Sequence, residues 1–114
     1  MEVTEGVLLR IFISEDDRRE GKPLAHWIVS KALEIGISGA TVFRAIEGYG
    51  RHSQIHTTHI IDLSNDLPLI LEIVDTKDNI DRLLAVLDEI LDEGIATTEK
   101  VLLRKYRSRG SKKT

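Results

Sequence analysis

Four short apolar segments, separated by two segments of helical periodicity, restrict the fold of this chain more than any other feature of its sequence. Residues 7–13, 40–46, 69–74 and 100–104 are rich in branched apolar side chains, which is typical of strands. In residues 24–35 and 80–91 the apolar side chains recur every three or four positions, which is typical of helices with one buried face. The order strand, helix, strand, strand, helix, strand predicts an α+β fold, a ferredoxin-like βαββαβ sandwich whose antiparallel sheet carries both helices on one face.

Residues at the ends of the two predicted helices favour the same boundaries. Pro23 suits the first turn of the first helix, where its missing N–H has no partner to lose, and Gly36 is placed to end that helix. Thr76 is placed to cap the start of the second helix, and Gly94 to end it. Each helical segment is therefore flanked by residues that start and stop helices.

The sequence predicts one domain followed by a basic tail. Its 114 residues suffice for a single core, which must be aliphatic because only 4% of the residues are aromatic. We expect residues 1–104 to form the domain and residues 105–114 a flexible tail. Six of the 16 cations lie in residues 104–114, which hold no acid, so the remaining chain has 10 cations against 19 acids and a net charge of −9.

Several functional classes are disfavoured by composition and motifs. The chain has no cysteine, which excludes disulfides and thiolate metal sites and favours a cytoplasmic location. No apolar run approaches the roughly 18 residues of a membrane span, and no signal segment is expected. Without a nucleophile-elbow or P-loop motif, we expect no enzyme and no catalytic residues. The basic tail would suit phosphate contacts with nucleic acid, but no aromatic-lined groove accompanies it, so a solubilising terminus is the favoured interpretation.

The first and third predicted strands are central in a sheet of this topology. Alternation places four apolar side chains on the face opposite the helices: Leu8, Phe12, Ile70 and Val74. Monomers seldom expose such a patch, so we expect a partner subunit to cover it, with Arg10 and Glu72 paired among the apolar neighbours. The alternative is a solvated face with scattered apolar residues.

A connection of about 20 residues, 48–67, separates the second and third predicted strands, whereas hairpin loops usually have about 2–5 residues. Gly48 and Gly50 at its start allow the backbone to approach a ligand closely, or to form a simple turn, and both interpretations stay open. Arg51 would suit an anion. The length of this loop and its glycines make it the candidate functional segment.

Three of the four histidines lie in the same loop. His52 and His56 would share one face of a strand, whereas His59 would point to the other. No carboxylate completes a ligand set before Asp62, so we expect no metal site. The histidines are better interpreted as surface residues or as neighbours of an anionic ligand.

Several segments resemble the nitrogen regulatory protein P-II superfamily. There the second strand runs into a Gly-Phe-Gly-Arg motif and a long T-loop, and the third strand starts after a proline; the matching segments here are residues 42–51 and 67–74. The chain is more closely similar, up to about Leu103, to the P-II-like family known as domain of unknown function 190. That similarity is carried by residues 6–13, 21–24, 39–42, 55–57 and 66–68.

The resemblance implies a compact homotrimer that binds an adenine nucleotide (ATP, ADP or AMP) in clefts between subunits and contacts a partner protein through the T-loop. Gly48, Gly50, Arg51 and His52 fall at the base of the T-loop, and Lys100 falls where P-II has a lysine before its last strand. These five residues are the candidate ligand-binding residues.

This sequence departs from the P-II pattern in three places. The glycine-rich phosphate loop is replaced by residues 93–100, the glutamine after Gly-Arg is His52, and no tyrosine for uridylylation lies between Arg51 and Leu67. The prediction is therefore a regulatory module for a small anionic ligand, without a certain cofactor. The alternative is a trimeric ion-tolerance-type protein that uses the loop histidines.

Overall fold

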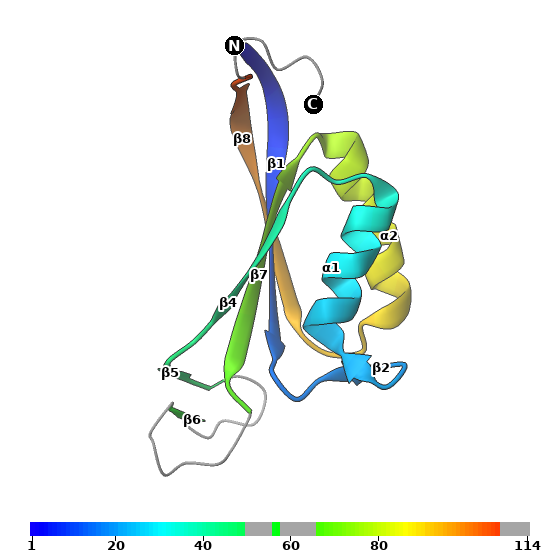
Figure 1. Cartoon of the computed structure of the whole chain (residues 1–114), viewed down its shortest axis with the longest axis vertical. Helices are drawn as coiled ribbons and strands as arrows, with labels where there is room; N and C mark the ends of the chain where they lie inside the picture. The colour runs from blue at the N-terminus through cyan, green and yellow to red at the C-terminus, as the bar shows by residue number, and fades with distance from the viewer. Residues whose placement is uncertain (50–55, 58–65, 108–114) are drawn as a thin grey trace.

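A four-stranded antiparallel sheet forms one layer of the molecule, and two helices cover one of its faces (Figure 1). This computed structural model describes residues 1–49, 56–57 and 66–107. The strands are arranged in the order β4-β7-β1-β8. In chain order the main elements are β1 (Glu2–Ser14), α1 (Leu24–Ile35), β4 (Ala40–Arg44), β7 (Pro68–Asp75), α2 (Lys77–Ile90) and β8 (Ile95–Lys105). The predicted fold class and the central position of the first and third main strands are confirmed.

The core lies between the helices and the two central strands. Ile11 of β1 is directly opposite Leu71 of β7, and both side chains are completely buried. Ile28 of α1 and Leu83 of α2 close over this pair of strands with no exposed surface. Because alternate strand residues face the same way, Leu9, Ile11 and Ile13 of β1 enter this core together with Leu69, Leu71 and Ile73 of β7.

The helix boundaries differ slightly from those expected. Pro23 precedes α1 as its N-cap, and Gly36 ends that helix in the left-handed conformation, with its N–H donating to Ala32 O at 3.2 Å. Thr76 caps α2 as predicted, since its side chain accepts from Asn79 N at 3.4 Å. The prediction for Gly94 was wrong, because α2 ends at Ile90 and Gly94 lies in the connection to β8.

Two strands are longer than the apolar pattern indicated. β1 begins at Glu2 rather than residue 7, and β8 begins at Ile95 rather than residue 100. The added residues of β1 pair with residues 101–105 of β8, and the added residues of β8 pair with residues 8–12 of β1. Their side chains are mostly exposed, so backbone pairing rather than burial defines these extensions.

Two small ladders complete the described secondary structure. β2 (Arg18–Arg19) pairs with β3 (Lys22–Pro23) before α1, and β5 (Glu47–Gly48) pairs with β6 (His56–Thr57) beyond β4. β4 itself ends at Arg44 rather than at residue 46. No helix in the described residues is long and apolar enough to cross a membrane.

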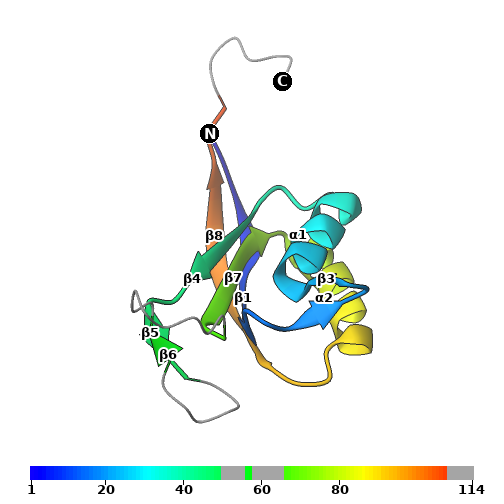
Figure 2. The same cartoon turned by 60° about the horizontal axis from the view of Figure 1, so that its bottom comes forward.

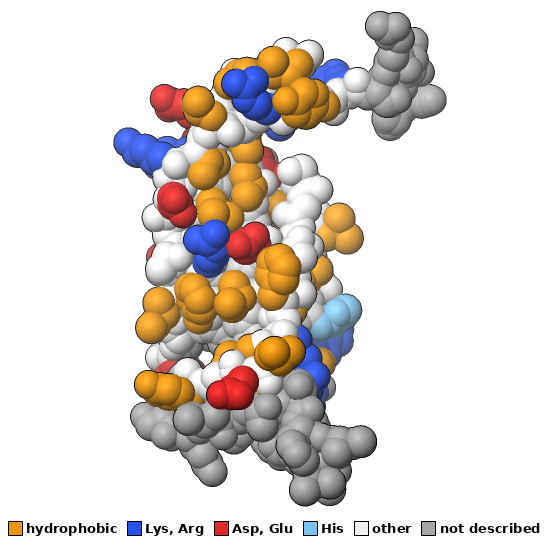
Figure 3. Space-filling view, turned by 90° about the vertical axis from the view of Figure 1, so that its left-hand side faces the viewer, with side chains coloured by type: hydrophobic (Ala, Val, Ile, Leu, Met, Phe, Trp, Pro, Cys, Tyr) orange, Lys and Arg blue, Asp and Glu red, His pale blue; other side chains and the backbone are white. Residues whose placement is uncertain are grey.

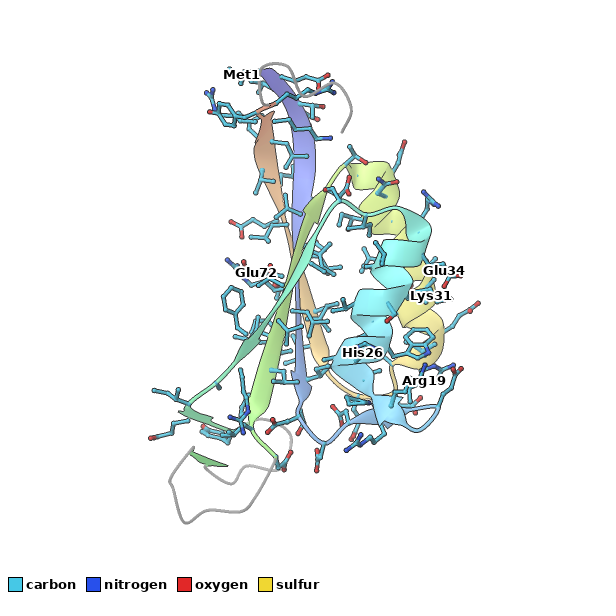
Figure 4. All side chains as sticks on the ribbon, viewed as in Figure 1. Met1, Arg19, His26, Lys31, Glu34 and Glu72 are labelled. Carbon is cyan, nitrogen blue, oxygen red and sulfur yellow. The ribbon has the colours of Figure 1, made fainter. Side chains whose placement is uncertain are left out.

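The face of the sheet opposite the helices carries apolar side chains around a charged centre (Figure 3). Phe12 and Phe43 are 38% and 49% exposed there, on β1 and β4. Arg10 and Glu72 are directly opposite each other, and Arg10 Nε donates to Glu72 Oε2 at 2.9 Å, so the predicted pair is confirmed. Glu72 points away from the helical layer, which carries His26 and Lys31 (Figure 4). We call this surface the open face.

Candidate functional site

The base of the long loop is a two-residue ladder. Glu47 is opposite Thr57, and Gly48 is opposite His56. The backbone of Ala45, just before this ladder, donates to Pro68 O at 3.0 Å, which ties the loop to the start of β7. The loop therefore leaves the domain at the end where β7 begins, away from the N-terminus (Figure 1).

A cavity of about 440 Å³ lies at the base of the loop. Three strand ends meet around it, because Phe12 near the end of β1 is opposite Ile95, and Ser14 is opposite Pro68. The lining residues come from β1, the loop base, β7 and the start of β8, and they are Phe12, Ile13, Ser14, Tyr49, Pro68, Gly94 and Ile95. The lining is largely apolar and contains two aromatic rings, so this cavity suits the flat, apolar part of a ligand.

Two glycines let backbone segments approach each other around this cavity. A Cβ on Gly48 would lie 3.3 Å from Cγ of Pro68. A Cβ on Gly94 would lie 3.2 Å from the carbonyl oxygen of Phe12, and Gly94 has φ +128°, a conformation that other residues rarely adopt. A larger residue at Gly48 would press on the Pro68 ring, and one at Gly94 would press on the backbone of Phe12 in a strained conformation.

Charged side chains fix the neighbouring connection. Arg44 forms a two-point contact with Glu15, with Nε and Nη2 donating to the two carboxylate oxygens at 2.7 and 3.2 Å. The side-chain hydrogen bond to Glu15 raises the pKa of Arg44. The hydroxyl of Ser14 is within hydrogen-bond distance of carboxylate oxygens of Asp16 and Asp66. This side of the loop base is therefore acidic and well connected.

Lys100 lies in a different place from the loop base. It is opposite Val7, five residues along β8 from Ile95, which corresponds to about 17 Å at the rise of an extended strand. Lys100 lines a separate hollow of about 270 Å³ together with Lys77 and Val7. Within one copy of the chain, Lys100 and Gly48 are not brought together.

Of the five candidate residues, the structure describes only Gly48 and Lys100. Gly50, Arg51 and His52 lie outside the described residues, and so does His59. No group of three or more histidine or acidic side chains that could hold a metal ion occurs in the described part of the chain. For the loop histidines outside the described residues, the expectation that they hold no metal ion rests on the sequence alone.

Sequence reasoning missed most of the cavity lining. The sequence pattern indicated Phe12 only as part of the open face, and it gave no separate reason to single out Tyr49. Pro68 and Ile95 flank the sheet at positions where pairing, not composition, brings them together. A usable signal existed in Gly94, because this glycine stands where P-II has its glycine-rich loop.

The cavity is continuous with the open face. Phe12 lines the cavity and also belongs to the open face, next to Ile70, its opposite residue on β7. Ile95, which is 66% exposed, lies on the other side of Phe12. A partner that covers the open face would therefore also close one side of the cavity.

A family model and a related protein sequence both match nearly the whole chain. The model of the domain of unknown function 190 (DUF190), described as an uncharacterized ACR, matches residues 6–103. A relative named UPF0166 protein, from Aquifex aeolicus (strain VF5), is 43% identical over 103 residues, which are 89% of this chain and 95% of the relative.

Two solved structures share the fold at low sequence identity. A putative PII-like signaling protein from Thermus thermophilus has a TM-score of 0.66 and 20% identity, covering 90% of this chain and 93% of that one. CPII from Thiomonas intermedia K12, a nitrogen regulatory PII-like protein bound to ADP, AMP and bicarbonate, has a TM-score of 0.63 and 14% identity, covering 90% and 91%. Both comparisons identify the fold of this chain as PII-like.

Proposed function

The chain belongs to the DUF190 family, and on this premise we propose that it is a P-II-like regulatory protein that binds a small anionic ligand, an adenine nucleotide, in clefts between its subunits. The ligand site is at the base of the loop formed by residues 48–67, and the loop itself contacts a partner protein. The role is binding and signalling rather than catalysis. The assembly is a homotrimer built on the open face.

The observation that carries the proposal is the cavity of about 440 Å³ between Tyr49, Phe12 and Ile95. Its lining is apolar and aromatic, which suits an adenine ring, and it opens onto the face that a second copy would cover. CPII, which shares the PII-like fold, is described as bound to ADP and AMP, which supports the choice of ligand. The cavity is one half of a cleft that an adjacent copy completes.

Cations supply the charge that the phosphates require. Arg51 and His52 follow the loop base in the sequence, three and four residues after Gly48. Lys100 lies about 17 Å along β8 from the cavity of its own copy, so it serves the cleft of a neighbouring copy. These few cations matter because the chain outside residues 104–114 carries a net charge of −9 and otherwise repels anions.

The loop converts binding into a signal. Tyr49 and Pro68 belong both to the cavity and to the ends of the loop, so a ligand in the cavity contacts the points at which the loop leaves the domain. A ligand shifts the loop between two states only if its affinity for those states differs. The bound state of the loop then engages or releases the partner protein.

Isothermal titration calorimetry with ATP, ADP and AMP tests the proposal. We expect saturable heat for at least one nucleotide, and native mass spectrometry should show that nucleotide retained on an oligomer. Arg51→Ala should weaken binding at least tenfold, whereas Lys22→Ala, which removes an exposed cation before α1, should leave it unchanged. No heat from any of the three nucleotides at millimolar concentration would overturn the nucleotide assignment.

A further inference from the structure

Positive charge is concentrated at one end of the molecule. Residues 1–3 and 104–114, which we call the basic end, hold six cations against one acid, a net charge of +5. The rest of the chain, which we call the acidic body, holds 10 cations against 18 acids, a net charge of −8. Within the described residues, the basic end presents three exposed cations, Arg104, Lys105 and Arg107.

The basic end projects beyond the rest of the fold. Residues 2–6 of β1 pair with residues 101–105 of β8, whereas β7 pairs with β1 only from Val7 onward. Figures 1 and 2 show these paired strands extending past the helices and β7, with the N-terminus at their tip. Five residue pairs at the rise of an extended strand span about 17 Å. The strands therefore hold the basic end away from the acidic body.

This separation lets the basic end attract an anionic surface although the whole chain is acidic. At physiological ionic strength, interactions between exposed charges are largely screened beyond about 8 Å. The pairing of β7 begins about two such lengths behind the tip, so most acids of the body are screened from a surface that the tip touches. The net charge of −3 for the whole chain thus understates the attraction of its basic end for anions.

Exposed apolar side chains accompany these cations. Met1 and Tyr106 are 71% and 74% exposed, and Met1 Sδ lies 4.0 Å from Arg104 Nη1. Figure 3 shows hydrophobic and basic side chains together at this end of the molecule. Apolar and amphipathic side chains among cations suit the boundary between lipid headgroups and acyl chains, where tyrosine is enriched. Nucleic acid offers no such apolar layer, and the described part of the basic end has no row of aromatic rings for stacked bases.

Family membership assigns no role to the basic end. The family model matches residues 6–103, and both the open face and the cavity at the loop base lie within that range. The basic end falls outside it, and the proposed ligand site does not use it.

We propose that the basic end docks the protein on a membrane surface rich in anionic phospholipids. Its cations contact the headgroup phosphates, while Met1 and Tyr106 enter the interface between headgroups and acyl chains. The loop base lies at the opposite end of the molecule, so a docked molecule keeps the loop free for its partner protein (Figure 1). The inference is independent of nucleotide binding.

Cosedimentation of the full chain with vesicles tests this docking site. Binding to phosphatidylcholine vesicles with about 30% phosphatidylglycerol should be at least tenfold tighter than binding to phosphatidylcholine alone. Raising NaCl from about 0.1 to 0.5 M should weaken it at least tenfold, because salt shortens the range of the attraction. Equal binding to the two kinds of vesicle would overturn the proposal.

Two double variants with the same change in charge locate the contact. Lys105→Gln/Arg107→Gln removes two cations from the basic end and should weaken vesicle binding at least tenfold. Arg18→Gln/Lys22→Gln removes two exposed cations before α1 and should change binding less than twofold. Thermal unfolding checks that both variants fold, and deletion of residues 108–114 is the second variant if the first does not. Equal losses in the two variants would refute the site.

Two competitors identify the source of the phosphates. Neither millimolar inorganic phosphate at constant ionic strength nor a short duplex DNA, matched to the lipid in phosphate groups, should release the protein from the vesicles. Both lack the apolar layer that Met1 and Tyr106 enter. Release by phosphate would assign the basic end to a free anion, and release by DNA would assign it to nucleic acid; either result overturns the proposal. Calorimetry with nucleotides tests the loop-base site separately.

Discussion

Arg10 on β1 and Glu72 on β7 form an ion pair in the middle of an otherwise apolar sheet face. They are directly opposite in register, with Arg10 Nε 2.9 Å from Glu72 Oε2, and Arg10 Nη1 is 3.5 Å from Glu99 Oε1 on β8. The side chains of Arg10 and Glu72 are 39% and 34% exposed in one copy of the chain. The energetic weight of this pair thus depends on whether a second copy covers it.

Replacing Arg10 by leucine distinguishes a covered open face from a solvated one. A solvent-exposed pair contributes about 0–1 kcal/mol, whereas breaking a buried pair costs about 3–5 kcal/mol because a charge stays buried without its partner. We expect Arg10→Leu to weaken assembly at least a hundredfold, as measured by sedimentation over a concentration series. The double variant Arg10→Leu/Glu72→Leu should recover most of the loss.

Lys77 and Asp81 provide the control for that measurement. They form an exposed pair on the surface of α2, with Nζ 2.7 Å from Oδ2, one turn apart. Lys77→Ala should therefore change both subunit stability and assembly very little, because water screens this pair. An equally small effect of Arg10→Leu on assembly would mean that water, not protein, covers the open face.

Asp75 is a buried carboxylate that ties three elements together. It is 4% exposed and accepts hydrogen bonds from Ser38 N at 2.9 Å, Thr76 N at 2.7 Å and Asn79 Nδ2 at 3.1 Å. Asp75→Asn replaces one carboxylate oxygen, which accepts a hydrogen bond, by an NH2 group that would face an N–H donor. We therefore expect a loss of about 1–3 kcal/mol in unfolding free energy. Urea denaturation measures this loss, and Asp81→Asn, on the exposed surface of α2, should change little.

The same residue predicts a dependence of stability on pH. Desolvation alone would raise the pKa of Asp75, but the hydrogen bonds from Ser38, Thr76 and Asn79 outweigh it, so the pKa is lowered from its usual 3.8. A lowered carboxyl pKa contributes stability above the unfolded value, and this contribution is lost as the pH falls through the folded value. Denaturation from pH 7 to 3 should show wild type and Asp75→Asn converging below about pH 4. A constant difference over this range would contradict the shift.

Gly6 lies on β1 just before Val7, the residue at which pairing with β7 begins, and an added methyl group has no room there. A Cβ would lie 2.6 Å from two carbons of Leu103 and 2.9 Å from the carbonyl oxygen of Asp75. Because the carbonyl belongs to the backbone, Gly6→Ala should destabilise the subunit by about 1–3 kcal/mol, measured by urea unfolding. Gly39→Ala, whose added Cβ meets nothing within 4 Å, should be neutral or slightly stabilising.

The order of the elements and the central strands follow from the sequence because burial dictates them. Residues such as Ile11 and Leu71 alternate with half-exposed neighbours. The buried apolar side chains of the two helices recur just as regularly, every three or four residues. The pairing of residues 2–6 with residues 101–105 could not be predicted in the same way, since Glu2 and Lys105 pair through their backbones while their side chains remain in water. Strand pairing that buries no side chains cannot be predicted from the pattern of apolar residues.

The candidate site was predictable only in part. The loop motif drew attention to Gly48, and Lys100 was grouped with it from its place in a family motif rather than from register. The strand register keeps Lys100 apart from Gly48 and instead places Ile95 opposite Phe12. Asp75 escaped notice because a single acid at a strand end has no distinctive pattern until the partners that surround it are known.

Tyr49 and Tyr106 provide a matched test of the cavity at the loop base, on the premise of the proposed nucleotide binding. Both side chains are exposed, at 63% and 74%, but only Tyr49 lines the cavity. Stacking of a base on an aromatic ring contributes about 1–3 kcal/mol, so Tyr49→Ala should weaken nucleotide binding about tenfold or more in calorimetry. Tyr106→Ala should leave the affinity unchanged. If the two variants bind the nucleotide with equal affinity, the adenine does not lie in this cavity. Binding would then depend on contacts between the phosphates and the cations near Arg51.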